Sequence, residues 1–124
     1  MIILTSQEIA QFRSQLAEYS VALEALDRIE DCEGDLEDAT IEMAIHVGQL
    51  PDTSENWLDG LAKRYRVSLC NKDLRENLIQ GNIKSMVEAL IEENECPALL
   101  ITPVVLYAVK SGIDQFCQPL EYKL

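Results

Sequence analysis

The sequence lacks the residues from which most catalytic and metal-binding sites are built. Its 124 residues include one histidine, His46, and five isolated glycines that form neither a phosphate-binding loop nor a dinucleotide fingerprint. There is no Gly-x-Ser-x-Gly nucleophile elbow. A helix would place Asp38, Glu42 and His46 on one face, but one such row seldom supplies three or four metal ligands. We therefore expect no catalytic residue, no metal and no cofactor, and predict that the protein is not an enzyme.

Long hydrophobic runs and closely spaced cysteines are also absent. Residues 1–4 are apolar but carry no basic residue and are too short for the core of a secretory signal. The apolar run from Ala98 to Val109 is shorter than the roughly 20 residues that span a bilayer. The four cysteines do not have the spacing of a zinc or redox motif: Cys32, Cys70, Cys96 and Cys117. We expect a cytoplasmic protein with reduced structural thiols and no membrane partner.

Basic residues are scarce and unevenly placed. The chain has 22 acids against 10 bases, which gives a net charge of -12. Residues 1–62 hold 14 acids and two bases, whereas residues 63–124 hold eight of each. Five bases fall between Lys63 and Arg75. A strongly negative chain repels phosphate backbones at long range, so we do not expect nucleic acid as the main partner.

What is present predicts a helical domain. Thr5 and Glu8 have the spacing of a capping box, in which each side chain binds the other residue's backbone amide. Apolar residues then recur at steps of three and four, which predicts a long first helix from about Ser6 to Glu30. We call this seam the first-helix seam: Ile9, Phe12, Leu16, Tyr19, Leu23 and Leu26. It can pack on the chain's own helices, the interpretation we prefer, or on a second copy in a homodimer.

Capping residues and apolar periodicity predict further helices over residues 35–47, 52–66, 72–80 and 83–93. Thr102 followed by Pro103 is typical of a helix start, so we expect a helix from there to Lys110. The Val-rich run leaves a strand as the alternative, and residues 113–124 show no clear pattern. The predicted fold class is all-α, a single compact bundle of five or six helices over residues 1–124. Its core would use Phe12, Leu16, Tyr19, Leu23, Met43, Trp57, Leu61, Leu90 and Val105.

Because no catalytic constellation is visible, we expect the protein to bind another protein, as an adaptor, regulator or subunit. Residues 24–42 hold nine acids and only one base, Arg28. Charge on such a surface sets orientation and association rate more than affinity. The candidate binding residues are five acids and three bases, in two patches: Asp31, Glu33, Asp35, Asp38 and Glu42, then Lys63, Arg64 and Arg66.

Residues 61–68, with the sequence LAKRYRVS, resemble the first helix and turn of helix-turn-helix DNA-binding proteins. The resemblance implies a degenerate motif at about residues 61–78, in which Arg64, Lys72 and Arg75 would contact DNA. Two positions depart from the pattern. Arg66 stands where the turn usually has glycine, and Lys72 stands where the second helix should have an apolar residue. A DNA-associated regulator is therefore the alternative function.

Overall fold

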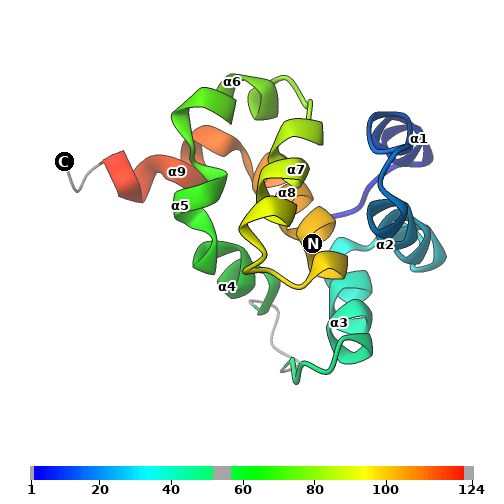
Figure 1. Cartoon of the computed structure of the whole chain (residues 1–124). Helices are drawn as coiled ribbons and strands as arrows, with labels where there is room; N and C mark the ends of the chain where they lie inside the picture. The colour runs from blue at the N-terminus through cyan, green and yellow to red at the C-terminus, as the bar shows by residue number, and fades with distance from the viewer. Residues whose placement is uncertain (1, 52–56, 122–124) are drawn as a thin grey trace.

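The computed structural model describes residues 2–51 and 57–121, and the regular structure of this part of the chain is helical (Figure 1). The described residues form nine helices: α1 (Ser6–Gln15), α2 (Ser20–Asp31), α3 (Leu36–His46), α4 (Trp57–Arg64), α5 (Arg66–Leu69), α6 (Lys72–Ile79), α7 (Lys84–Glu93), α8 (Ala98–Ser111) and α9 (Ile113–Glu121). The all-α class is confirmed. The helices are more numerous than the five or six predicted, the first helix is shorter than predicted, and the expected helix start at residues 52–55 lies outside the described residues.

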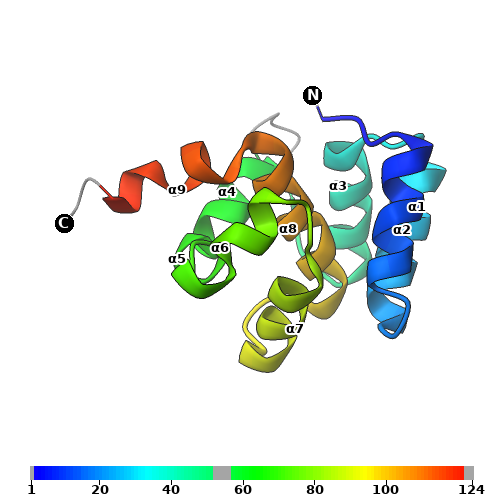
Figure 2. The same cartoon turned by 90° about the horizontal axis from the view of Figure 1, so that it is seen from above.

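Helix α8 is the centre of the fold. It packs against α2, α3, α4, α7 and α9. Figures 1 and 2 show it between α2 and α3 on one side and α4 on the other. Every residue from Leu99 to Leu106 is buried, as expected for a helix that is apolar nearly all round. The strand alternative is not what this segment forms.

The predicted start of α8 is wrong by one helical turn. The helix begins at Ala98, directly after Pro97, and Pro103 lies inside it. A proline in this position removes one helical hydrogen bond. Burial of Leu99, Leu100 and Ile101 against the neighbouring helices favours extending α8 past this point.

The long first helix is also wrong, because the chain turns between α1 and α2. Leu16 ends α1 and Tyr19, in an extended conformation, begins α2. The turn lets the two helices pack as a hairpin, in which Arg13 of α1 pairs with Asp27 and Glu30 of α2. The hairpin buries apolar seam residues inside the chain. Four of them are buried: Ile9, Phe12, Leu16 and Leu26.

The end of α1 is fastened to a distant turn by a side-chain amide. Gln15 Nε2 donates to the carbonyl of Gly81 at 3.0 Å, and the amide of Ile83 donates to Gln15 Oε1 at 2.8 Å. Both ends of the amide are therefore used on the turn between α6 and α7. This contact gives a tertiary reason for α1 to end where it does.

The N-terminal residues are held along the turn that joins α2 to α3. The amide of Leu4 donates to the carbonyl of Gly34 at 2.8 Å, and the amide of Leu36 donates to that of Ile2 at 3.0 Å. Gly34 has φ +84°, and a Cβ there would lie 2.2 Å from the Leu4 carbonyl oxygen. Only glycine can adopt this positive φ without strain and also leave room for the Leu4 carbonyl oxygen.

The predicted capping and core residues are largely confirmed. Both hydrogen bonds of the Thr5–Glu8 capping box are present, and Asp35 caps α3. Of the nine predicted core residues, six are buried, and the other three are half-buried: Tyr19, Leu23 and Trp57. In α3, the apolar side chain of Ile45 is 62% exposed.

Cys70 and Cys117 form a disulfide, which corrects the prediction that all four cysteines are reduced. The two residues are 47 positions apart in sequence, so no short spacing motif predicts that they form a disulfide. The fold places the end of α5 beside α9, with the two Cα atoms 5.7 Å apart. Cys32 and Cys96 are free. Within the described residues no single helix is long and apolar enough to cross a membrane.

Candidate functional site

The predicted acidic patch divides into residues with structural partners and residues that face solvent. The Asp35 carboxylate accepts the backbone amide of Asp38 at 3.1 Å and so caps α3. The carboxylate of Glu42 is also engaged, as described below. Asp31, Glu33 and Asp38 are exposed. The structure thus places all five acids around the turn between α2 and α3, but only some of them are available to a partner through their carboxylates.

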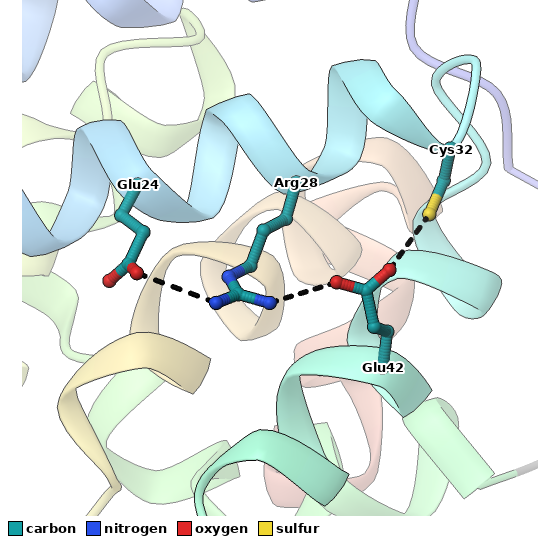
Figure 3. A network of polar contacts seen from close by, with 4 residues as sticks. All are labelled: Glu24, Arg28, Cys32 and Glu42. Atoms are coloured by element: carbon teal, nitrogen blue, oxygen red, sulfur yellow. Dashed lines mark hydrogen bonds and ion pairs between the residues drawn. The ribbon is translucent and has the colours of Figure 1, made fainter.

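A polar network crosses from α2 to α3 (Figure 3). Arg28 donates to Glu42 at 2.8 Å and pairs with Glu24 at 3.5 Å. The thiol of Cys32 lies 3.7 Å from the second oxygen of Glu42. Burial and the nearby carboxylate of Glu42 raise the pKa of the Cys32 thiol, so it stays protonated near neutral pH. A protonated thiol is a poor nucleophile.

The row of Asp38, Glu42 and His46 does run along α3, as the spacing predicted. His46 is exposed at the end of the helix, whereas Glu42 turns toward Arg28. No group of three or more His, Cys, Asp or Glu residues within the described ranges is arranged to hold a metal ion.

The basic patch pairs locally rather than with the acidic run. Lys63 Nζ lies 2.6 Å from Asp59, one turn earlier on α4. The guanidinium of Arg66 lies over the ring of Phe116, 5.1 Å from its centroid. Arg64 is exposed. Lys63 and Arg66 line one pocket, so the structure brings together two of the three predicted bases.

Residues 61–78 do not form the tight turn of a helix-turn-helix. Arg66 does not take the positive φ that the missing glycine would require, because it is the first residue of the extra helix α5. Arg75 is engaged in an ion pair with Asp114 of α9 at 2.9 Å. Lys72 is exposed at the start of α6. The likeness to DNA-binding proteins is therefore one of sequence and does not extend to the turn.

An apolar groove lies where α2, α7 and α8 meet, and we call it the α2–α7–α8 groove. It has a volume of about 240 Å³ and is lined by Glu18, Tyr19, Ser20, Val21, Ala22, Val87, Ile91, Ala98, Ile101 and Thr102. Val21 is 39% exposed and Ile91 is 41% exposed. Large apolar side chains left open around one concavity are typical of a binding surface.

Three carboxylates lie near Tyr19, which lines this groove: Glu18, Glu88 and Glu92. Tyr19 donates its hydroxyl to Glu88 of α7. That hydrogen bond, with burial and the charges of Glu88, Glu18 and Glu92, raises the pKa of Tyr19 to about 12. The one ion pair seen at this rim joins Lys84 to Glu18 at 3.7 Å, within the part of the chain that the structure describes. The groove therefore combines an apolar floor with a negative rim.

The negative rim continues along α2 toward the network of Figure 3. Val21, Glu24 and Arg28 are three and four residues apart, so they lie on one face of the helix. Glu24 and Glu42 share Arg28, which leaves this strip with two carboxylates for one guanidinium. Glu24 therefore shares the face of α2 that carries Val21, whereas the later acids of the run, from Asp31 onward, lie at the end of α2 and beyond it.

Sequence reasoning missed the groove, although it named its helices. Neither Val21 nor Ile91 was predicted to bind a partner, and Val21 lies off the first-helix seam. In the sequence, the one indication of the groove is such an apolar residue outside the first-helix seam. The hollow itself depends on how α2, α7 and α8 cross, which the sequence pattern does not specify.

Comparisons with protein-family models, with curated proteins and with solved structures give no match. Function is therefore inferred from the geometry and charge of the chain itself.

Proposed function

We propose that this protein acts by binding another protein, and that the α2–α7–α8 groove receives an amphipathic basic helix of the partner. The observation that carries the proposal is the combination of half-exposed Val21 and Ile91 with a rim of carboxylates. An amphipathic helix in a groove is a common recognition mode, in which apolar side chains one turn apart fill the hollow. Lysine or arginine on the helix flanks would then meet Glu18 and Glu92.

The charge of the whole chain supports the same partner chemistry. A net charge of -12 attracts a basic segment from a distance and raises its association rate. The exposed acids Asp31, Glu33 and Asp38 add to this field without filling the groove. In the proposal, apolar contacts supply most of the affinity, and the acidic surface supplies orientation. The role is that of an adaptor, regulator or subunit.

A labelled leucine–lysine peptide with helical amphipathic spacing, LKKLLKLLKKLLKL, tests the proposal by fluorescence anisotropy. We expect a Kd of about 10 μM or tighter at moderate salt. Ile91→Asp should weaken binding by about tenfold or more, because it places a carboxylate in the apolar contact. Ile79→Asp is the matched control. Ile79 is 50% exposed on α6, outside the groove, and its variant should bind within about twofold of the wild type.

A scrambled peptide of the same composition separates the groove from simple charge attraction. It keeps every lysine but loses the apolar stripe, so it should bind more weakly than the amphipathic peptide. Equal affinity for the two peptides, or equal losses in Ile91→Asp and Ile79→Asp, would refute the groove as the binding site. Thermal melting by circular dichroism confirms that each variant is folded.

A further inference from the structure

A second concave site, distinct from the groove, lies where α4, α5, α8 and α9 meet. The pocket has a volume of about 260 Å³, and its polar lining is Asp59, Lys63, Arg66, Tyr107, Ser111 and Gln115. None of these residues lines the α2–α7–α8 groove. In a chain with a net charge of -12, a hollow with two cations and one carboxylate is an exception to the general surface.

Both oxygens of the carboxylate in this pocket already have a partner. Asp59 accepts the Tyr107 hydroxyl on one oxygen at 2.6 Å and pairs with Lys63 on the other at 2.6 Å. Burial raises the pKa of Asp59, but the hydrogen bonds from Lys63 and Tyr107 outweigh it and hold that pKa below its usual value. Asp59 is therefore ionised at neutral pH and neutralises one cation, which leaves one positive charge over.

That remaining charge is on Arg66. Its guanidinium face lies over Phe116, and its Nε is buried without a hydrogen-bond partner among the described residues. Buried donors in folded proteins nearly always have a partner, so an unpaired one calls for a physical explanation. Among the side chains that the structure describes, Arg66 is in no ion pair, although its charge helps to lower the pKa of Asp59. An arginine held flat by an aromatic ring presents its N–H edge as a fixed fork.

The wall that faces Arg66 is also held in place. Gln115 and Phe116 come from α9, and the next residue, Cys117, is joined to Cys70 at the end of α5. The disulfide therefore fastens two of the helices that line the pocket, α5 and α9. A pre-positioned cation pair needs little ordering when a ligand binds.

We infer that this pocket binds an oxyanion, the phosphoryl group of a small polar molecule or free phosphate, between Arg66 and Lys63. A guanidinium fork and an ammonium are the usual donors to phosphoryl oxygens. Ser111 and Gln115 are placed to contact the polar remainder of the ligand. The negative charge of the rest of the protein would make such binding weak and sensitive to salt.

Isothermal titration calorimetry at low salt tests the inference with three probes: inorganic phosphate, glucose 6-phosphate and glucose. We expect inorganic phosphate, glucose 6-phosphate or both to bind with a Kd of about 1 mM or tighter, and glucose not to bind. Tighter binding of glucose 6-phosphate assigns the pocket to phosphorylated molecules, whereas equal or tighter binding of phosphate assigns it to the free ion. If neither inorganic phosphate nor glucose 6-phosphate gave heat of binding at about 10 mM, the proposed site would be refuted.

Matched variants locate any binding that is seen. Arg66→Gln and Lys63→Gln should each weaken it by about tenfold or more, because each removes a charge-assisted hydrogen bond. Lys72→Gln makes the same charge change at an exposed position outside the pocket and should leave affinity within about twofold. Equal losses of affinity in Lys72→Gln and Arg66→Gln would show that the ligand is attracted to basic side chains in general, and would refute binding in the pocket. Because Lys63→Gln acts on a different helix from Arg66→Gln, misfolding of one variant does not remove the test.

Discussion

Removing the disulfide between Cys70 and Cys117 should destabilise the protein by an amount that follows from its position. The bond joins residues 47 positions apart, and so closes a long loop in the unfolded chain. On the chain-entropy model a loop of that length gives about 4 kcal/mol of stabilisation at 25 °C. Cys70→Ala is the cleaner variant, because Cys70 is half-buried whereas Cys117 is only 1% exposed. Truncation at Cys117 would add a packing loss to the effect of the crosslink.

The expected loss is large on the scale of a small domain. With an unfolding entropy of about 2.1 cal/mol/K per residue, 4 kcal/mol corresponds to a fall in Tm of about 15 °C. The entropic estimate is an upper one, because the bond also acts on the folded state. Contacts of α9 with α5, α6 and α8 persist without the bond, so we expect a folded but less stable protein.

The assay combines thermal melting with a count of thiols. The oxidised wild type should show two thiols to an alkylating reagent under denaturing conditions, those of Cys32 and Cys96, and reduction should expose the other two. Reduction should lower Tm in the wild type and leave Cys70→Ala unchanged. Cys32→Ala is the control and should respond to reduction as the wild type does. Four thiols in the oxidised protein, or a change on reduction below about 1 kcal/mol, would contradict the reasoning.

Two further predictions concern backbone contacts, and urea unfolding measures both. Gly34→Ala should cost more than about 3 kcal/mol, because it adds a clash with the Leu4 carbonyl to a positive φ. Gly48→Ala has the same φ of +84° with nothing within 4 Å, and should cost only about 1 kcal/mol; similar losses at the two sites would argue against the clash. Gln15→Ala should cost about 2–3 kcal/mol, because the amide of Ile83 and a facing carbonyl lose their partner; a loss under about 0.5 kcal/mol would mean that water replaces the side chain without penalty.

The parts of the fold that sequence could predict are those decided within a few residues. The Thr5–Glu8 capping box and the Asp35 cap depend on short, fixed spacings, and both form as predicted. Burial of Leu16 and Met43 follows from helical periodicity, which also depends only on neighbours. Structure predicted from such short-range patterns forms when the tertiary contacts favour the same conformation.

The parts that could not be predicted depend on contacts between distant segments. Residues 16–19 contain neither glycine nor proline, so nothing local ends α1. The turn is explained by the bond of Gln15 to the α6–α7 turn and by the hydroxyl of Tyr19 on Glu88, each more than 60 residues away. The start of α8 predicted at Pro103 was wrong for the same reason, because burial of the preceding residues against other helices outweighs the loss of one helical hydrogen bond. The disulfide, the groove and the Arg66 pocket are likewise products of helix packing.

The two proposed sites are built from opposite ends of α8, and this separation makes each a control for the other. Ala98 and Ile101 line the groove, whereas Tyr107 and Ser111 line the pocket. The nearest lining residues of the two sites on α8, Thr102 and Tyr107, are five residues apart, which is about 8 Å along a helix. No residue lines both sites. Residues so far apart without shared partners act additively, so Ile91→Asp should leave phosphate binding intact and Arg66→Gln should leave peptide binding intact.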